Sequence, residues 1–317
     1  MESSNNLKDN TLISIVVPCY NEEKALTPFY KELVRNIDNI KYCNFQVIFI
    51  DDGSSDKTLE IAMDICNKDK RFKYISFSRN FGKEAAMLAG LKASEGKYTV
   101  VMDCDLQDPP SLLKEMIETM DLGWSSVATR RCTRAGEPII RSFFARKFYK
   151  IINKISKVDI VDGARDFRMM SREMVDAIIS LNEYNRFTKG IFGWVGFDTK
   201  WIEYENIERV DGETKWSFFG LLLYGIEGIV AFTTAPLRLA SLIGMITSFI
   251  SFIYIVYTFI KTLVLGIDVP GYASLISFIM FLGGIQLIAL GIIGEYISKT
   301  YMEVKKRPHF IIKETNL

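Results

Sequence analysis

Short apolar runs alternate with amphipathic stretches along the first third of the chain. Four runs are rich in Val, Ile, Phe and Tyr and end in turn residues, which is typical of strands; they cover 12–21, 45–56, 72–80 and 97–105. The stretches between them carry apolar residues at intervals of three and four, which predicts helices over 22–37, 56–69 and 82–96. This alternation predicts an α/β fold with a mostly parallel sheet and helices on both of its faces.

Two long apolar stretches in the second half of the chain contain no charged residue. They cover 239–260 and 273–294, and each is long enough to cross a bilayer as a helix. A third apolar stretch, 216–236, carries Glu227 at its middle, so we expect an amphipathic helix lying in the membrane interface rather than a span. Basic residues flank the outer sides of the two spans, which predicts by the positive-inside rule that both termini are cytoplasmic.

These patterns predict a multi-pass protein of the cell membrane with four parts. Residues 1–10 are polar, which argues against an N-terminal signal peptide. The parts are a cytoplasmic α/β domain over 1–214, an interfacial helix over 215–237, two transmembrane helices within 238–298, and a cytoplasmic tail over 299–317.

Composition and charge narrow the classes of function. Hydrophobic residues make up 49% of the chain, in line with a membrane part, and the net charge of +1 gives no sign of nucleic-acid binding. The five cysteines are scattered without C-x-x-C spacing, which favours reduced thiols over disulfides or a zinc site. A single histidine, His309, excludes Ser-His-Asp catalysis and a multi-histidine metal site.

One internal stretch, 130–157, is strongly basic and carries an apolar stripe. It contains nine Lys and Arg against one Glu. We expect a basic amphipathic helix there that contacts the membrane surface and attracts anionic lipid headgroups. An ordinary helix with a solvated charged face is the alternative.

Polar side chains follow all four predicted strands. Asn21-Glu22, Asp51-Asp52, Arg79-Asn80 and the pair Asp103 and Asp105 stand at the carboxyl ends of the runs. In an open parallel sheet these ends meet at one crevice, where ligands bind. The pattern therefore predicts a polar site at this edge of the sheet.

The motif Asp103-x-Asp105 needs a positive partner. If both residues belong to a strand, their side chains point to one face, where two charges about 6 Å apart repel by roughly 3 kcal/mol. An EF-hand is excluded because its sixth and twelfth positions would be Asp108 and Lys114. An aspartyl phosphatase is disfavoured by Gln107, and the chain has no dinucleotide fingerprint and no P-loop. A divalent-metal clamp for a nucleotide diphosphate is the remaining interpretation.

Four motifs in order resemble the family 2 inverting glycosyltransferases of the A-type, Rossmann-like fold. They are "SIVVPCYNEE", "VIFIDDGSSDKT", "RNFGKEAAMLAGL" and "MDCDLQDPP". Four later segments resemble the polyprenyl-phosphate branch of that family, the bacterial bactoprenol glucosyltransferases. They are "GARDFRMMSR", "NRFTKGIFGWVGF", "RVDGETKWSF" and "GIIGEYISKTYMEVKKRPHFII".

The resemblance implies a role for individual residues of this chain. The expected nucleotide-sugar contacts are Pro18, Tyr20, Asn21, Glu22, Asp52, Lys83 and Asp103. The expected ligands of Mg²⁺ or Mn²⁺ are Asp103, Asp105 and Gln107. The expected contacts to the acceptor phosphate are Arg130 and Arg141, with Arg209 and Lys215 added because these basic residues precede the interfacial stretch. Ala145 stands where related enzymes have a serine.

Two carboxylates are expected at the reacting centre, Asp105 and Asp166. The alternative for Asp166 is a structural pair with Arg165 or Arg168. A lipid phosphate is largely dianionic at pH 7 and already nucleophilic, so the reaction requires no histidine base.

The expected function is transfer of one hexose, glucose from UDP-glucose, to undecaprenyl or another polyprenyl phosphate. The transfer would be metal-assisted, inverting and in one displacement at the cytoplasmic face, in cell-envelope glycosylation. The alternatives are another donor such as UDP-N-acetylglucosamine and an inactive nucleotide-sugar-binding scaffold. A processive synthase is disfavoured because Q-x-x-R-W is absent. A homo-oligomer is compatible with the sequence.

Overall fold

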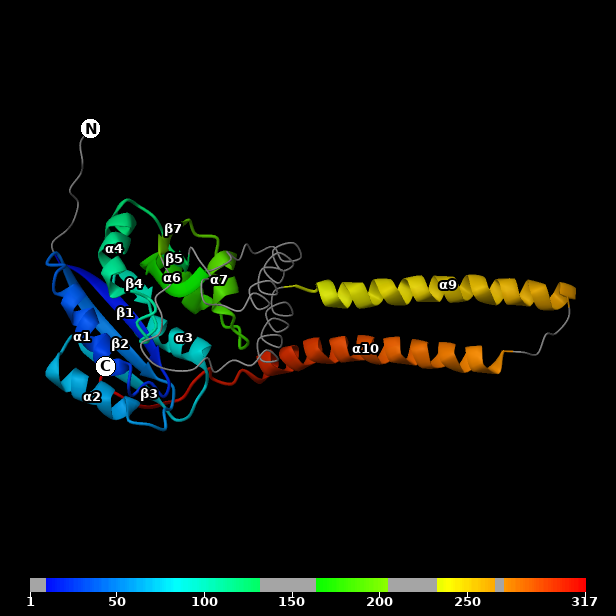
Figure 1. The fold of residues 1–317 in the computed structure, drawn as a ribbon, viewed down its shortest axis with the longest axis horizontal. Coiled ribbons are helices and arrows are strands. Elements are labelled where there is room, and N and C mark those ends of the chain that lie inside the picture. Colours follow the sequence, from blue (N-terminus) through cyan, green and yellow to red (C-terminus); the bar gives the residue numbers. More distant parts are fainter. Residues whose placement is uncertain (1–9, 132–163, 205–232, 266–270) are drawn as a thin grey trace, which may run out of the picture. The chain divides into compact units, whose positions relative to one another are not determined.

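The structure is a computed structural model that describes residues 10–131, 164–204, 233–265 and 271–317. The chain divides into two compact units. One comprises Met1–Gly225 together with Pro308–Leu317, and the other comprises Ile226–Arg307. Figure 1 shows the first as an α/β body and the second as a pair of long helices.

Strands and helices alternate through the first part of the α/β unit, as the hydrophobic pattern predicts. The element order is β1 (Thr11–Cys19), α1 (Leu26–Ile37), β2 (Cys43–Asp51), α2 (Thr58–Lys68), β3 (Phe72–Phe77), α3 (Lys83–Ala93) and β4 (Tyr98–Val101). The predicted strands and helices are therefore confirmed, with small shifts at their ends.

The remaining elements of this unit extend the sheet at both sides. They are a 3₁₀ turn η1 (Pro110–Leu112), α4 (Leu113–Asp121), β5 (Ser126–Arg131), β6 (Ala164–Ser171), α6 (Arg172–Ser180), α7 (Thr188–Trp194), β7 (Thr199–Tyr204) and β8 (Ile312–Thr315).

The eight strands form one sheet in the order β7-β5-β6-β4-β1-β2-β3-β8. Strands β1 to β4 are parallel, and β7 is parallel to β5. Strand β6 is antiparallel to both β4 and β5, and β8 is antiparallel to β3. The predicted mostly parallel α/β sheet is confirmed. The pattern did not indicate the antiparallel strands, because pairing direction depends on the path of the connections.

Successive residues of β1 point alternately to the two faces of the sheet, and both faces are covered by apolar side chains. Ile13, Ile15 and Val17 belong to the main core cluster, together with the buried residues of α1 and α4. On the other face, a Cβ added at Gly90 of α3 would lie 2.1 Å from Cγ1 of Val16. Helices thus cover both faces of the sheet, and α3 packs on it closely because glycine leaves room for Val16.

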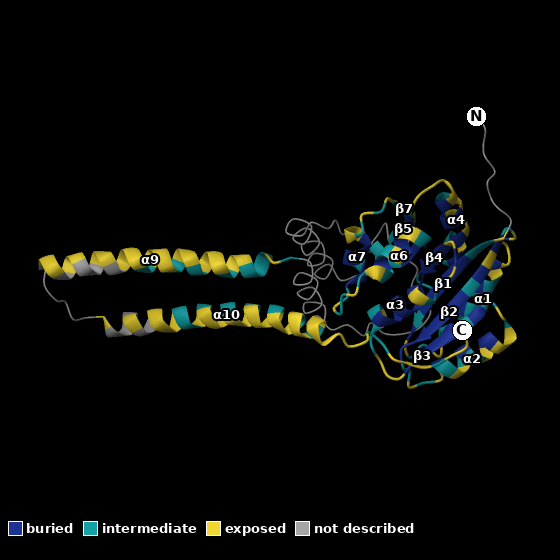
Figure 2. Cartoon of the chain, turned by 180° about the vertical axis from the view of Figure 1, so that it is seen from behind, coloured by how far each residue is buried: buried dark blue, intermediate teal, exposed yellow. Residues whose placement is uncertain are grey.

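The second unit contains the helices α9 (Ala235–Leu265) and α10 (Tyr272–Lys305). Figures 1 and 2 show them side by side, and Figure 2 shows that their described residues are largely exposed. The hydroxyl of Tyr296 donates to the carbonyl oxygen of Thr233 at 2.7 Å.

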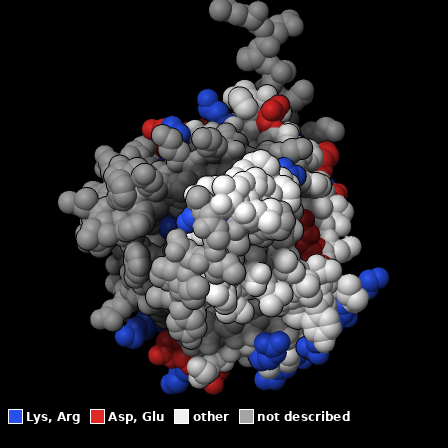
Figure 3. Space-filling model, turned by 90° about the vertical axis from the view of Figure 1, so that its right-hand side faces the viewer, with Lys and Arg blue, Asp and Glu red and all other residues white. Residues whose placement is uncertain are grey.

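Both helices contain a segment apolar and long enough to cross a membrane, Ala235–Tyr254 and Phe278–Lys305. Large apolar side chains such as Phe249 and Ile288 are 65% and 67% exposed, and Figure 3 shows mostly uncharged atoms over this unit. An uncharged surface of this kind is suited to lipid rather than to water. The predicted apolar helices are confirmed, whereas most of the expected interfacial helix (215–237) and of the basic stretch (130–157) lies outside the described residues.

The segment predicted as a tail, 299–317, contains regular structure. Helix α10 continues to Lys305 and ends at Lys306, which adopts a left-handed φ of 47°. Strand β8 then pairs with β3, and the ring of Phe310 stacks on Phe77 at 5.0 Å. The C-terminal residues therefore complete the sheet of the α/β unit.

Candidate active site

The loops that follow β1 and β2 are tied to each other. The side-chain oxygen of Asn21 accepts from the backbone N–H of Ser55 at 2.8 Å, and the N–H of Asn21 donates to Oγ of Ser54 at 3.0 Å. The N–H of Glu22 donates to Oγ1 of Thr58 at 2.8 Å. These bonds hold the predicted nucleotide contacts Asn21 and Glu22 in fixed positions at the carboxyl end of the sheet.

Two further predicted nucleotide contacts lie on and just after β1. Pro18 pairs in register with Ile50 of β2 and is partly buried. Tyr20 follows the end of the strand and is 41% exposed. The tyrosine ring is therefore accessible beside the two interlocked loops.

The predicted nucleotide contact Asp52 is almost completely buried, with 3% of its surface exposed. Its two oxygens accept from the backbone N–H groups of Phe81 at 2.6 Å and Gly82 at 2.9 Å. Burial raises the pKa of Asp52, and these two bonds oppose that shift. The next residue, Gly53, has φ +68°, and a Cβ there would lie 2.4 Å from the carbonyl carbon of Arg79. The turn after β2 therefore packs directly on the loop before α3.

The D-x-D motif lies beyond the end of its strand. Strand β4 ends at Val101, so Asp103 and Asp105 lie in a turn, in which Leu106 has φ +59°. The expectation that the two carboxylates share one face of a strand is wrong, because pairing with β1 ends at Val101. Oδ1 of Asp105 instead accepts from the N–H of Gln107 at 3.1 Å, which shapes the turn.

The positive partner that this motif requires is Lys83, the first residue of α3. Its Nζ lies 2.7 Å from Oδ1 of Asp103 and 2.8 Å from Oδ2 of Asp166, which projects from β6. Burial by itself would raise the pKa of Asp166, but the charges of Lys83 and Lys189 outweigh it and hold that pKa well below the usual range. Asp166 therefore stays ionised and pairs with Lys83 rather than with a neighbouring arginine.

The predicted metal ligands form an open donor set. In the described segments no group of three or more His, Cys, Asp and Glu side chains is arranged to hold a metal ion. Asp103 and Asp105 supply two carboxylates, and Oε1 of Gln107 accepts from Nη2 of Arg165 at 3.0 Å. Mg²⁺ commonly takes only one or two protein carboxylates and completes its shell with water and substrate phosphates. These residues therefore fit a divalent cation shared with a diphosphate.

A buried cluster that sequence reasoning missed anchors the D-x-D turn. Asp108 is 1% exposed; its Oδ1 lies 3.3 Å from Nε of Arg165 and accepts from the hydroxyl of Tyr204 at 2.9 Å. Burial raises the pKa of Asp108, and the charge of Arg165 opposes the shift. Strands β6 and β7 thus hold the D-x-D turn through Arg165 and Tyr204. The two arginines of "RDFR" were the one feature of the sequence that could have indicated an ion pair here.

Glu84 is a second residue that the motifs did not single out. It lies in the first turn of α3, and its Oε2 accepts from the backbone N–H of Thr188 at 3.0 Å and from the hydroxyl of that residue. Burial raises the pKa of Glu84 to about 7, although both hydrogen bonds oppose the shift. Glu84 also lines a cavity beside Arg79, Arg186 and His309.

The residues predicted for the acceptor phosphate are only partly described. Arg130 is the last residue but one of β5 and donates from Nε to Oε1 of Glu203 at 2.8 Å. Arg141, Arg209 and Lys215 lie outside the described residues, as does Ala145. Their assignment to the acceptor stays a prediction.

Comparison with known proteins gives two family matches. Residues 14–179 match the family described as Glycosyl transferase family 2, and residues 235–300 match the family described as GtrB C-terminal hairpin. The second match covers most of α9 and α10.

Similar proteins align with nearly the whole chain. The putative glycosyltransferase CsbB of Bacillus subtilis (strain 168) is 49% identical, over 96% of this chain and 92% of that protein. The prophage bactoprenol glucosyl transferase homolog of Escherichia coli (strain K12) is 42% identical, over 95% and 98%. The SfII prophage-derived bactoprenol glucosyl transferase of Shigella flexneri is 43% identical, over 96% and 98%.

Proposed function

Because the chain belongs to glycosyl transferase family 2, we propose that this glycosyltransferase transfers glucose from UDP-glucose to a polyprenyl phosphate. Similarity to bactoprenol glucosyl transferases along 95% of the chain carries the choice of glucose and of this lipid class. The match of the helical pair to the GtrB C-terminal hairpin supports a membrane-bound acceptor. Transfer of N-acetylglucosamine has no comparable support.

The donor would bind at the carboxyl ends of β1, β2 and β4. Tyr20, Asn21, Glu22 and Asp52 line the nucleotide side in this proposal, and the D-x-D turn takes the diphosphate. Asp103 and Asp105, with Gln107, would hold Mg²⁺ or Mn²⁺. When bound, such a cation stabilises the negative charge of the departing diphosphate.

The proposed chemistry is a single displacement at the anomeric carbon. An oxygen of the lipid phosphate forms the new bond to that carbon while the bond to the diphosphate oxygen breaks. UDP leaves with the electron pair of the broken bond, and the configuration inverts. The dianionic phosphate carries no proton that must be removed, so ionised Asp166 would position the sugar or the acceptor.

We place the reaction at the cytoplasmic face of the membrane. The two apolar helices fit a membrane anchor, and the basic residues outside the spans favour cytoplasmic termini. The α/β unit would then meet UDP-glucose in the cytosol and the lipid phosphate at the membrane surface.

The proposal is tested by incubating the purified protein with undecaprenyl phosphate and labelled UDP-glucose, UDP-N-acetylglucosamine or UDP-galactose, with and without EDTA. We expect label in the lipid from UDP-glucose only, and its loss with EDTA. Label in the lipid from another donor would contradict the choice of glucose as the transferred sugar. Binding of UDP-glucose without any lipid product would indicate a scaffold.

An aspartate variant tests the metal separately. We expect Asp105→Asn to lower the rate of transfer by about 100-fold, or about 2.7 kcal/mol in the barrier. Asp64→Asn is the matched control, since Asp64 is exposed on α2 and pairs with Lys68 of the same helix. Unchanged transfer by Asp105→Asn would contradict the clamp.

A further inference from the structure

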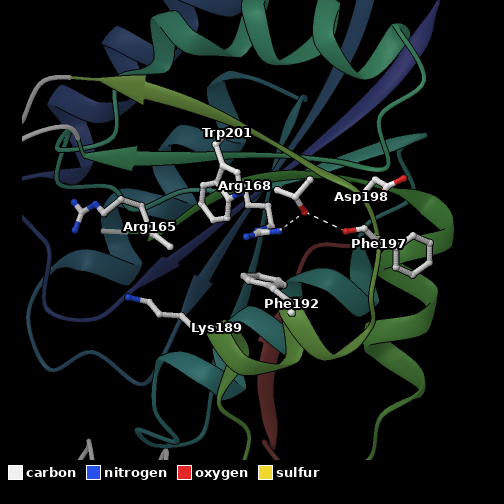
Figure 4. Close-up of a pocket in the computed structure, with 10 residues that line it drawn as sticks. Arg165, Arg168, Lys189, Phe192, Phe197, Asp198 and Trp201 are labelled. Carbon is white, nitrogen blue, oxygen red and sulfur yellow. Dashed lines mark hydrogen bonds between the residues drawn. The ribbon is translucent and has the colours of Figure 1, made fainter. Parts of the chain in front are cut away.

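A separate cavity of about 260 Å³ lies between β6, α7 and β7. Its lining includes the cations Arg165, Arg168 and Lys189, the rings of Phe192 and Trp201, and one carboxylate, Asp198. Figure 4 shows Arg168 between the two rings, with Arg165 and Lys189 on one side of it. None of the residues expected to bind donor or metal is among the described residues that line it.

Arg168 is a buried cation that forms no ion pair within the described residues. It is 4% exposed, and its guanidinium lies 4.5 Å from the ring centre of Phe192 and 5.3 Å from that of Trp201. Nη1 donates to Oγ of Ser126 at 3.1 Å and to Oγ1 of Thr199 at 3.2 Å. Nε is buried and has no hydrogen-bond partner within the described part of the chain.

The aromatic rings and hydroxyls account for only part of what this guanidinium requires. Stacking satisfies its two faces and the hydroxyls satisfy Nη1. No carboxylate of the described residues lies within 4 Å of the Arg168 guanidinium. A buried charge without an ion-pair partner is costly, and burial lowers the pKa of Arg168 to about 10, although the charge of Asp166 opposes the shift. An anion in the cavity would supply the missing partner.

Lys189 adds a second positive charge to the same cavity. It is partly buried on α7, and in the described segments no carboxylate lies within ion-pair distance of its Nζ. Arg165 differs, because its Nε lies 3.3 Å from Asp108. Asp198, the acid of the lining, is exposed. Arg168 and Lys189 therefore give the cavity a net positive charge.

We infer that Arg168 and Lys189 bind a phosphate monoester in this cavity and that, if the proposed function holds, this group is the acceptor's phosphate. The volume holds a phosphate with several waters, since each water needs about 30 Å³. A monoester dianion matches two cations in charge.

The position of the cavity favours the acceptor over the donor. Asp166 and Arg168 are two residues apart on β6, so their side chains lie on the same face of the strand. On this face Asp166 contacts Lys83, which also holds Asp103 of the expected donor site. Lys189 acts electrostatically on the same Asp166. Asp166 thus separates the expected donor site from the cavity, as a transfer between two phosphates requires.

In this arrangement Arg168 and Lys189 are positioning residues for the nucleophile. A phosphate oxygen forms the bond to the anomeric carbon, the bond from that carbon to the UDP oxygen breaks, and UDP takes the electron pair. The two cations hold the phosphate and transfer no proton.

A binding experiment without donor tests the cavity directly. Decyl phosphate, a phosphate monoester on a single alkyl chain, is titrated into the full-length protein in detergent and followed by calorimetry. We expect Lys189→Met to weaken binding at least tenfold and to leave UDP binding unchanged. Lys200→Met is the control, because Lys200 is exposed on β7 and faces Trp124 outside the cavity; it should bind as the wild type does.

Two further arms identify the source of the signal. Inorganic phosphate that binds with the same dependence on Lys189 shows that the phosphate group alone is recognised, which supports the site. Equal binding of decyl phosphate to Lys189→Met and to the wild type would overturn the proposed phosphate site. Weaker UDP binding by Lys189→Met would also overturn it, because the donor would then occupy the cavity. Arg168→Lys, checked for folding by circular dichroism, should also weaken decyl phosphate and spare UDP.

Kinetics separate this inference from the proposed function. For Lys189→Met we expect KM for undecaprenyl phosphate to rise at least tenfold while KM for UDP-glucose stays the same. If the wild type transfers glucose and the variant has an unchanged KM for undecaprenyl phosphate, the cavity does not bind the acceptor. The proposed function is then unaffected. If the wild type transfers no glucose and yet binds decyl phosphate in a Lys189-dependent way, the proposed function is wrong. Phosphate binding in the cavity is then still supported.

Discussion

Lys83 provides the counter-charge at the centre of the site. Its ammonium lies within 3 Å of carboxylate oxygens on both Asp103 and Asp166, so it joins the D-x-D turn to β6. The opposite charges raise the pKa of Lys83 against the effect of burial, so it stays cationic at neutral pH. An ammonium bound to Asp103 competes with a divalent cation for the same oxygen.

Replacing Lys83 should therefore strengthen metal binding in the absence of nucleotide. For Lys83→Met we expect about tenfold tighter Mn²⁺ binding, or about 1.4 kcal/mol, measured by electron paramagnetic resonance of free Mn²⁺. Lys92→Met is the control, because Lys92 is exposed on the same helix. Equal or weaker Mn²⁺ binding by Lys83→Met would show that the ammonium does not compete.

Glu84 should make the stability of the α/β unit depend on pH. Its folded pKa of about 7 lies above the ordinary value of 4.5, so the folded state binds a proton more tightly than the unfolded state. The contribution is complete below pH 4.5 and is lost as pH rises to about 7.

Glu84→Gln should remove this dependence. We expect the wild type to lose about 2.6 kcal/mol of unfolding free energy between pH 4.5 and 7, most of the roughly 3.4 kcal/mol that a shift from 4.5 to about 7 is worth, and the variant to lose less. Urea unfolding monitored by tryptophan fluorescence at several pH values measures the free energy of unfolding of both proteins. Identical slopes in both proteins would assign the pH dependence to other groups.

Two elements determine how the sheet is completed at its sides. Strand β6 enters antiparallel between β4 and β5 and brings Asp166 to the D-x-D turn. Strand β8 covers the outer side of β3, where the N–H of Tyr74 donates to Oδ1 of Asn316 at 2.7 Å. An uncovered edge would offer unpaired backbone groups to other chains. Both strands are paired antiparallel, and neither follows from the strand and helix alternation.

Deleting residues 312–317 should expose the edge of β3. We expect a lower thermal unfolding midpoint and more aggregate in size-exclusion chromatography, because the backbone pairs and the Asn316 bond, each worth about 1 kcal/mol, are lost. Lys313→Ala is the control for the exposed side of β8. A truncated protein that remains monodisperse with an unchanged midpoint would show that β8 does not protect the edge.

The whole chain combines a catalytic α/β unit with a largely apolar pair of helices. The net charge of the whole chain is only +1, so electrostatic attraction to anionic lipid would depend on local basic stretches such as 130–157. The exposed apolar side chains of α9 and α10 are suited to a lipid environment. A glycosyltransferase with a lipid substrate benefits because its acceptor is confined to the same surface.

Membrane topology tests this arrangement. With the α/β unit in the cytosol, protease added to inside-out vesicles should digest it, and protease added to intact spheroplasts should leave it whole. Immunoblots against the first 200 residues measure both. Digestion in spheroplasts would place this unit outside the cell and contradict the expected use of cytosolic UDP-glucose.

Local patterns determined much of this protein in advance. The strands from β1 to β4 and the helices between them follow from periodicities of a few residues. The two apolar helices follow from the length of their uncharged stretches. The need for a cation at the D-x-D motif also follows from the sequence, because two neighbouring carboxylates repel wherever they lie. The reason first given, a shared strand face, was wrong, since β4 ends before the motif.

Only the tertiary structure decided which groups meet. Lys83 and Asp166 are 83 residues apart, and Tyr74 and Asn316 are 242 apart. No periodicity spans such distances, because these contacts depend on the order and direction of strands in the sheet. The cavity around Arg168 has the same origin, since three elements enclose it. The sequence by itself thus determined the elements and the chemistry available, and the folded sheet determined the partner of each charge.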